Sequence, residues 1–303
     1  MSIVQNRIVV GTDGSRASYG AVAYAARTAA SRDAGLLVVS TYDRPALLAT
    51  GSRLTPRQSA LESINVESDA IVERAVGIGR DTAPGIEVDG LSVEGHAAET
   101  MVEYSKEARI VVLGSRGLGG FEGMLLGSVS AAVARYSSCP VIVTREETAD
   151  LDAAGPVVVG IDGSETSVNA TDWAFSEAAH RKAMLVAAHT WVRPVPPLSA
   201  DGIDVSEGGW QQFEDEQLAM LSRLLDGPRS TFPQVEVKRE VSQGRAVDTL
   251  IDLARDAQLL VVGTRGLGGF RGMLLGSTSR ALLHAAPCPV MVVRPESHPE
   301  RQV

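Results

Sequence analysis

The chain has 303 residues, about twice a common single-domain length, and its formal net charge at pH 7 is −9. Hydrophobic residues make up 44% of the chain and aromatic residues 4%, which predicts an Ala, Val, Leu and Ile core typical of a parallel sheet covered on both faces. The acidic balance disfavours nucleic acid as a partner. The sequence shows no leader pattern and no apolar run long enough to span a membrane, so we expect a cytoplasmic location without membrane contact.

Strand and helix patterns alternate along the first half of the chain. Continuous aliphatic runs predict five strands, at 7–12, 36–41, 86–95, 109–114 and 140–145. Segments with helical periodicity separate these runs and predict helices at about 15–32, 57–79, 96–108 and 128–137. Because helices connect successive strands, we expect right-handed crossovers and a mostly parallel sheet with helices on both faces.

The second half of the chain repeats the first at a constant offset. The segment VVGTDGS at 9–15 recurs as VVGIDGS at 158–164, and residues 114–143 match residues 263–292 at 19 of 30 positions. Strands of the second copy are predicted at 157–162, 185–191, 235–244, 258–263 and 289–294. A repeat of this length is a whole domain and not a solenoid unit, so the fold class is α/β with two tandem, doubly wound, five-stranded domains.

An acidic segment rich in small residues and without hydrophobic periodicity lies between the two copies. We assign the first domain to 1–146, the linker to 147–155, the second domain to 156–296 and a tail to 297–303. The two cysteines, Cys139 and Cys288, occupy equivalent places in separate copies. We therefore expect buried thiols and no disulfide between them.

A glycine-rich loop follows the fourth predicted strand of each copy, at the sheet edge where doubly wound folds bind ligands. Its glycines can aim several backbone amides at one anion, and the helix that follows begins with unsatisfied N–H groups. Serine hydroxyls and a guanidinium add further donors. The pattern predicts a phosphate site in each copy, built from Gly114-Ser115-Arg116-Gly117, Gly127-Ser128 and Ser130, and from Gly263-Thr264-Arg265-Gly266, Gly276-Ser277 and Ser279.

The alternative is a flexible loop before a helix that is capped by serine, which needs no ligand. Capping requires one residue, whereas here the whole glycine series recurs at identical spacing, which favours phosphate binding. The pattern is not a Walker loop, because no Lys precedes Ser128 or Ser277. The dinucleotide fingerprint also fails, because its third glycine is replaced by Glu122 and Arg271.

An aspartate follows the first strand of each copy, at the same edge of the sheet. Asp13 and Asp162 can accept hydrogen bonds from ribose hydroxyls or an exocyclic amine, or they can serve as turn residues before the first helix. Thr41 and Thr190 end the second strands, where backbone groups can meet the edge of a base. By themselves these threonines are ordinary strand residues.

These residues together resemble the universal stress protein family. The ATP-binding branch of that family carries G-x2-G-x9-G-S/T after strand four and an aspartate after strand one, and both copies here are complete. The resemblance implies a sheet of order 3-2-1-4-5, like that of the adenine nucleotide α-hydrolases, with ATP between strands one and four. It implies that the nucleotide contacts Gly11, Thr12, Asp13, Thr41, Gly114, Ser115, Arg116, Gly117, Gly119, Gly120, Gly127, Ser128, Val129 and Ser130 in the first copy. The corresponding residues of the second copy are Gly160, Ile161, Asp162, Thr190, Gly263, Thr264, Arg265, Gly266, Gly268, Gly269, Gly276, Ser277, Thr278 and Ser279.

The resemblance also bears on assembly and on differences between the copies. Family domains pair through their last strands, so 140–145 and 289–294 are expected to pair antiparallel, and the chain is expected to form a homo-oligomer through last-strand and loop surfaces. The loops after the second strands differ strongly between the copies, at 44–60 and 193–209. Unequal affinities at the two sites are therefore expected.

A catalytic set is not evident in the sequence. The five histidines share no metal-ligand spacing with each other or with cysteines, and no nucleophile elbow is present. Asp13 and Asp162 are candidates to hold Mg²⁺ on a phosphate tail, but one carboxylate per site is thin support for phosphoryl transfer. We expect an ATP-binding regulatory or stress-response protein with an unidentified protein partner. The alternatives are a slow ATP hydrolase or self-phosphorylating enzyme, and a scaffold without nucleotide.

Overall fold

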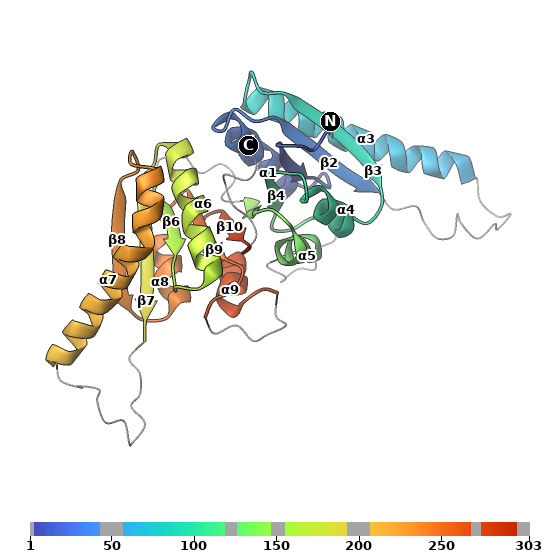
Figure 1. The fold of residues 1–303 in the computed structure, drawn as a ribbon. Coiled ribbons are helices and arrows are strands. Elements are labelled where there is room, and N and C mark those ends of the chain that lie inside the picture. Colours follow the sequence, from blue (N-terminus) through green and yellow to red (C-terminus); the bar gives the residue numbers. More distant parts are fainter. Residues whose placement is uncertain are drawn as a thin grey trace. The chain divides into compact units, whose positions relative to one another are not determined.

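The computed structural model describes residues 3–42, 57–118, 126–146, 155–192, 207–267 and 274–295. The chain divides into two compact units, the first containing strands β1 to β5 and the second β6 to β10 (Figure 1). Within these ranges, no helix combines the length and the apolar character that a membrane span requires.

The first unit alternates strands and helices as the sequence predicts. Its elements are β1 (Ile8–Gly11), α1 (Arg16–Ala30), β2 (Leu36–Tyr42), α3 (Arg57–Thr82), β3 (Val88–Glu94), α4 (Ala97–Tyr104), β4 (Ile110–Gly114), α5 (Ser128–Tyr136) and β5 (Val141–Thr144). The strand order is β3-β2-β1-β4-β5, and every pair is parallel, which confirms the predicted 3-2-1-4-5 sheet. The helix expected at 96–108 is shorter than predicted, because it ends at Tyr104 and the chain then turns toward β4.

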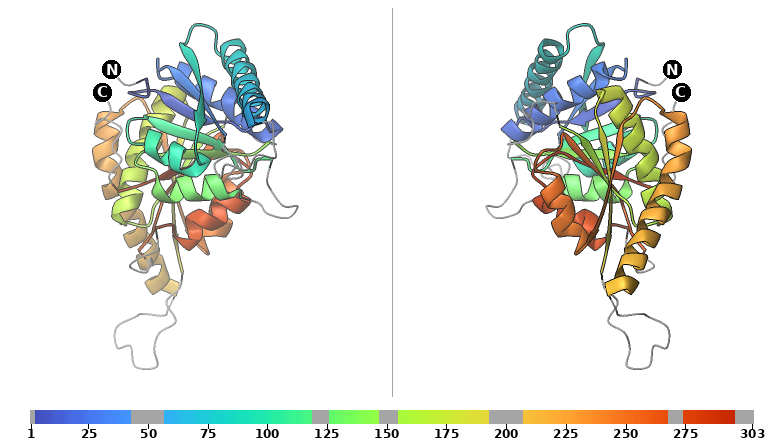
Figure 2. Two further views of the ribbon diagram at one scale, coloured as in Figure 1. Left: turned by 90° about the vertical axis from the view of Figure 1, so that its right-hand side faces the viewer. Right: turned by 90° about the vertical axis from the view of Figure 1, so that its left-hand side faces the viewer.

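The second unit has the same architecture. Its elements are β6 (Val157–Gly160), α6 (Glu165–Arg181), β7 (Leu185–Trp191), α7 (Glu207–Thr231), β8 (Val237–Gln243), α8 (Ala246–Leu253), β9 (Leu259–Gly263), α9 (Ser277–Ala285) and β10 (Val290–Val293). The strand order is β8-β7-β6-β9-β10, again with parallel pairs. Figure 2 shows α6 and α7 on one side of this sheet and α8 and α9 on the other.

Burial along the strands explains why the central strands are aliphatic. In β1, β4 and β5 of the first unit nearly every residue is buried, because helices cover both faces of the sheet. The outer strand β3 is mostly half-buried, and β8 of the second unit contains only half-buried and exposed residues. The edge strands therefore tolerate charged residues such as Lys238 and Glu240, which the central strands exclude.

The Asp-Gly-Ser turn after β1 shows how sequence determines local structure at the ligand edge. Gly14 adopts a left-handed conformation with φ of 83°, which costs little only for glycine. The side chain of Ser15 then accepts a hydrogen bond from the amide of Ser18 and caps α1. Gly163 and Ser164 repeat the same geometry before α6. The turn therefore begins each first helix directly above the end of the central strand.

A buried ion pair anchors α6 in the second unit. Nε of Arg181 donates to Glu177 across 2.8 Å, and the side chains are only 10% and 1% exposed. Arg181 also donates to the side chain of Gln258, which in turn donates to the carbonyl of Gly155. These contacts link the last turn of α6 to the segments that precede β9 and β6.

We expect Glu177→Ala to destabilise the second unit by about 3–5 kcal/mol, because it removes a carboxylate that pairs with a buried guanidinium. The matched control is Asp252→Ala, which removes an exposed ion pair with Arg255 in the same unit and should cost at most about 1 kcal/mol. Urea denaturation followed by tryptophan fluorescence measures both variants, because all three tryptophans of the chain lie between 173 and 210. Equal losses for the two variants would show that the buried pair contributes no more stability than the exposed pair.

Candidate functional site

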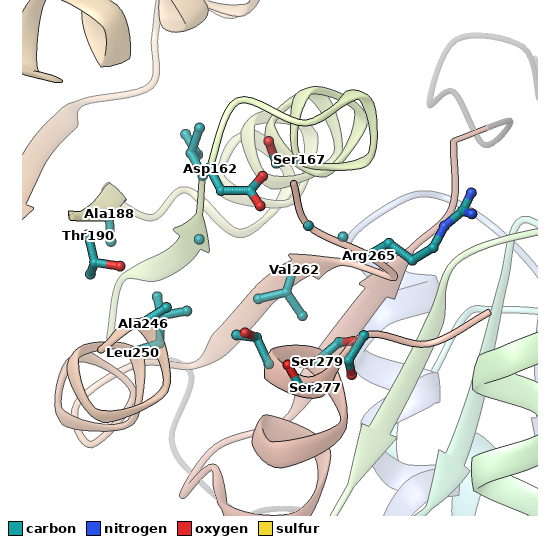
Figure 3. Close-up of a pocket in the computed structure, with 16 residues that line it drawn as sticks. Asp162, Ser167, Ala188, Thr190, Ala246, Leu250, Val262, Arg265, Ser277 and Ser279 are labelled. Atoms are coloured by element: carbon teal, nitrogen blue, oxygen red, sulfur yellow. The ribbon is translucent and has the colours of Figure 1, made fainter. Parts of the chain in front are cut away.

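Each unit has a cavity at the carboxyl ends of its central strands, where β1 and β4, or β6 and β9, lie side by side. The cavity of the first unit measures about 250 Å³ and is lined by Gly11, Thr12, Asp13, Ser18, Val39, Thr41, Ala97, Met101, Leu113, Gly114, Arg116, Gly117, Gly127, Ser128, Val129 and Ser130. The cavity of the second unit measures about 350 Å³ and is lined by Gly160, Ile161, Asp162, Ser167, Ala188, Thr190, Ala246, Leu250, Val262, Gly263, Arg265, Gly266, Gly276, Ser277, Thr278 and Ser279 (Figure 3).

The two cavities are built from equivalent positions. Each lining residue of the first cavity has a counterpart exactly 149 positions later in the second, without exception among the sixteen. This is the offset of the sequence repeat. The connections from the neighbouring strands β1 and β4 leave toward opposite faces of the sheet, so the cavity opens at the topological switch point. The duplicated sequence therefore produces a duplicated site.

The aspartate after the first strand joins two loops of each site. Oδ1 of Asp13 accepts the amide of Ser15 across 3.1 Å, and Oδ2 accepts the amide of Leu118, in the glycine-rich loop, across 2.7 Å. Asp162 repeats both bonds with Ser164 and Leu267, at 3.0 and 2.9 Å. One carboxylate oxygen thus has the role of a turn residue before the first helix, as one of the two alternatives predicted. The other oxygen joins the turn after β1 or β6 to the glycine-rich loop. Local sequence gives no sign of this second bond, because its partners are 105 residues apart.

These hydrogen bonds also alter the acidity of the aspartates. Partial burial acts to raise the pKa of Asp13, but hydrogen bonds from Ser15 and from the amide of Leu118 outweigh it and hold the pKa below its ordinary value. The pKa of Asp162 is lowered in the same way, against the effect of burial, by Ser164 and the amide of Leu267. Both carboxylates are therefore ionised at neutral pH while they hold the loops together.

Packing against the aspartate explains one of the glycines that recur at the same spacing in both copies. A methyl group added at Gly117 would overlap Oδ2 of Asp13, and one added at Gly266 would overlap Oδ2 of Asp162. Gly114 is needed for a different reason, because an added methyl would lie 3.1 Å from the backbone of Ala17 in α1. The first glycine of the motif thus permits close contact between helix and strand, and the second makes room for the carboxylate.

The helices that begin at the glycine loops have unusual N-termini. Gly127 and Gly276 are the N-cap residues of α5 and α9, and neither helix has a side-chain cap or an acidic residue in its first turn. By contrast, Ser15 and Ser164 cap α1 and α6. Helices α4 and α8 also lack a side-chain cap, but each has an acidic residue in its first turn. The uncapped ends line the two cavities, so their unsatisfied N–H groups and partial positive charge are available to an anion.

The serines of the motif have distinct surroundings. Ser128 and Ser277 are exposed at the starts of their helices. Ser130 is buried, and its hydroxyl donates to the carbonyl of Gly114 across 2.6 Å. The hydroxyl of Ser279 instead lies within hydrogen-bond distance of the carbonyls of Thr264, one residue further along, and Gly276, at 3.0 and 3.1 Å. The inner serines thus use their protons to fasten the helix to the end of β4 or β9.

Ser115 and Thr264, which the sequence places among the binding residues, do not line the cavities. Both are buried, and their amides continue the sheet by donating to the carbonyls of Thr144 and Val293. The carbonyl of Ser115 accepts the amide of Gly127 across 2.7 Å, and the second unit repeats this bond. These residues hold the loop closed on itself through backbone contacts, which any residue type can make.

The arginines of the motif lie at the mouths of the cavities. Arg116 and Arg265 are exposed, and in the described part of the chain neither guanidinium forms an ion pair. Figure 3 shows the side chain of Arg265 extending away from Asp162 and Val262. Such a side chain can turn toward a bound anion at the cavity mouth. The predicted residues Gly119, Gly120, Gly268 and Gly269 lie outside the described residues.

Sequence reasoning missed five positions in each cavity. One is the buried serine of the first helix, and four are apolar residues on the second strand, the fourth strand and the third helix of each repeat: Ser18, Val39, Ala97, Met101 and Leu113, with Ser167, Ala188, Ala246, Leu250 and Val262. The apolar residues look like core residues in the sequence. In the structure each of them is either half-buried or fully buried. No local pattern distinguishes an apolar residue that faces a cavity from one that faces a neighbour.

Other reactive side chains lie apart from the cavities. Burial raises the pKa of both Cys139 and Cys288 to about 12, so these thiols stay protonated. His189 is buried on β7, where Nδ1 lies 2.7 Å from the carbonyl of Ile161 and Nε2 lies 3.1 Å from Gln217. Within the described ranges, no group of three or more His, Cys, Asp or Glu residues gathers where a metal ion could bind.

The fold and the duplicated crevice define a tandem α/β protein, and comparison with known proteins assigns its family. The model of the universal stress protein family matches residues 5–145 and again 154–294, so the chain belongs to this family. A universal stress protein of Mycobacterium tuberculosis is 38% identical over 300 residues, which cover 95% of this chain and 94% of that protein.

Two further comparisons cover nearly the whole chain. A universal stress protein of Mycolicibacterium smegmatis is 36% identical over 309 residues, with 97% of this chain and 99% of that protein aligned. The crystal structure of a universal stress protein from Archaeoglobus fulgidus superposes with a TM-score of 0.66 at 19% identity, over 96% of this chain and 99% of that one. The structural likeness shows that the tandem fold is shared.

We expect Asp162→Asn to destabilise the second unit near pH 6 by about 1 kcal/mol or less, because a charged acceptor in a half-exposed position is replaced by a neutral one. A pKa lowered by folding adds stability above the unfolded value of about 3.9, and this stability is lost as pH falls through the lower folded pKa. The difference between wild type and variant should therefore shrink below about pH 4. Urea denaturation followed by tryptophan fluorescence at several pH values measures it. The exposed control Asp226→Asn should change the free energy of unfolding less at pH 6. If the difference in free energy of unfolding between wild type and Asp162→Asn does not depend on pH, folding does not lower the pKa of Asp162.

Proposed function

We propose that each unit binds one molecule of ATP and that the protein acts as a nucleotide-responsive regulator in a stress response. The single observation that carries this proposal is the pair of uncapped helix N-termini, Gly127-Ser128 and Gly276-Ser277, that open into cavities of identical layout. A helix that needs only a cap could use serine, as α1 and α6 do. Two helices that leave their amides free at the same cavity position favour an anionic ligand.

The distribution of polarity within each cavity fits a nucleotide. One end is apolar, with Val39, Ala97, Met101 and Leu113 in the first unit. The other end carries the glycine loop and the start of α5, which supply backbone N–H groups and hydroxyls. A purine is a flat apolar group with a few polar edge atoms, and a phosphate chain is strongly anionic, so the base suits the first end and the phosphates the second. Thr41 lies at the end of β2, beside the apolar end, and can present backbone groups to the edge of the base.

The aspartate supports binding mainly by holding the cavity in shape. Both of its oxygens already accept backbone amides, so Asp13 and Asp162 keep the two loops in position before the ligand arrives. Oδ2 accepts one hydrogen bond, from the loop amide, so it retains a further lone pair for a ribose hydroxyl. Among the residues that the structure describes, a single carboxylate lines each cavity, so a magnesium ion brought with ATP would be held chiefly by phosphate oxygens.

Calorimetric titration with ATP tests the proposal directly. We expect two molecules of ATP per chain, and mass spectrometry of ligand released from freshly purified protein should detect an adenine nucleotide. The same preparation should be assayed for ATP hydrolysis under single-turnover conditions. Hydrolysis above background that is lost in Asp13→Ala combined with Asp162→Ala would favour a slow hydrolase over a binding protein. No heat of binding with ATP, ADP or cyclic AMP would refute nucleotide binding.

Substitution of the second motif glycine tests the loop itself. We expect Gly117→Ala with Gly266→Ala to weaken ATP binding at least tenfold, about 1.4 kcal/mol, because each new methyl displaces the aspartate that positions the loop. The matched control is Gly77→Ala with Gly227→Ala, where an added methyl meets no atom within 4 Å. The control pair should bind ATP normally. Unchanged affinity in the loop variant, with the fold intact by circular dichroism, would remove the loop from the proposed site.

A further inference from the structure

The two cavities share their phosphate end and differ mainly at their apolar end. Eleven of the sixteen equivalent lining positions carry the same residue in both units. The five differing pairs are Thr12 and Ile161, Val39 and Ala188, Met101 and Leu250, Leu113 and Val262, and Val129 and Thr278. Three of these five pairs belong to the apolar wall. The divergence between the repeats is therefore concentrated where we place the base.

The wall residues on the strands are smaller in the second unit. Ala188 on β7 replaces Val39 on β2 and lacks two methyl groups, and Val262 on β9 replaces Leu113 on β4 and lacks one methylene. The larger cavity, about 350 Å³ against about 250 Å³, belongs to the unit in which these two strand residues are smaller. The sizes of the side chains and the volumes of the cavities thus agree in direction.

Distances from the glycine that ends the first strand, Gly11 or Gly160, show where the two apolar walls differ. A methyl placed on Gly11 would lie 2.7 Å from Cδ2 of Leu113, whereas one placed on Gly160 would lie 3.4 Å from Cγ1 of Val262. On the helix side the order is reversed, because Leu250 comes to 2.9 Å of that methyl and Met101 only to 3.4 Å. The additional room of the second cavity therefore lies over the strands, and the α8 side partly offsets it.

We propose that the second cavity accepts an adenine nucleotide enlarged on its base, which the first cavity excludes, and that the residue pairs Val39/Leu113 and Ala188/Val262 set this difference. The proposal rests on the proposed nucleotide binding and adds that the two sites of one chain select different members of the adenine-nucleotide class. The walls are buried between strands and helices, so the first cavity cannot expand without disturbing a packed core. One methylene in such a pocket changes affinity by about 10- to 200-fold.

The distribution of tryptophan provides a site-specific measurement. Trp173, Trp191 and Trp210 are the three tryptophans of the chain, and all belong to the second unit. Trp191 directly follows Thr190, which lines the second cavity, and stacks on Trp210 with a centroid distance of 6.1 Å. A change of tryptophan fluorescence on binding therefore reports the second site, whereas calorimetry counts both sites.

The test uses the full-length protein and three probes: ATP, ATP enlarged at N6 by a benzyl group, and ATP enlarged at C8 by an azido group. We expect ATP to bind with a stoichiometry of two. At least one enlarged analogue should bind with a stoichiometry of one and change the tryptophan fluorescence. Competition between that analogue and ATP should then be confined to the fluorescent site.

Exchange of the wall residues should transfer the selectivity. Val39→Ala with Leu113→Val should raise affinity for the analogue at the first site at least about tenfold and bring its stoichiometry to two. Ala188→Val with Val262→Leu should lower affinity at the second site by a similar factor, with ATP binding retained. Each exchange introduces residues that the other unit already accommodates, and retained ATP binding shows that the variant is folded.

The outcomes separate this proposal from the one on which it rests. If ATP binds at neither site, nucleotide binding itself is wrong. If ATP binds twice but both analogues bind both sites equally, or neither analogue binds, the difference in base selectivity is refuted. Selectivity that is present in the wild type but unaffected by both exchanges would refute the assignment to these four residues.

Discussion

The candidate sites depend on one contact, the acceptance of a loop amide by the aspartate after the first strand. Asp13 holds the amide of Leu118 and Asp162 holds that of Leu267, so each glycine loop is tied to the turn above the central strand. The contact requires a glycine beside the carboxylate, at Gly117 and Gly266, because any side chain there would occupy the same space. Hydrogen bonding keeps the carboxylates charged, and a charged acceptor binds an amide more strongly than a neutral one.

The sheet places this contact where a ligand can use it. Parallel strands bring all their carboxyl ends to one edge, and the reversal of strand order between β1 and β4 keeps helices from covering that point. The loop closes on itself through backbone bonds of Ser115 and Thr264, and the inner serines fasten the next helix to the strand end. The helix amides therefore point into the cavity without any movement of the backbone. Such preorganisation reduces the conformational entropy that a ligand must overcome on binding.

Duplication within one chain allows the two sites to diverge separately. The glycines, the aspartate and the two serines at the helix start, where we propose that phosphates bind, are the same in both units. The apolar wall has changed at three positions, and it also belongs to the core of each unit. Small changes of side-chain volume there are tolerated when the total packing is kept, so the shape of this part of the cavity can change while the fold remains.

Much of the fold could be predicted from the sequence by itself. The repeat determined that there are two domains, the alternation of strand and helix patterns determined the α/β class, and glycine spacing located the loops, because each of these signals is local or periodic. The tertiary structure alone decided which residues face the cavity. Ser115 and Thr264 belong to the motif yet are turned into the sheet, whereas Val39, Met101 and Leu113 look like core residues yet line the site. The aspartate's bond to a loop 105 residues away was likewise invisible in the sequence, because it depends on the crossover that brings two strand ends together.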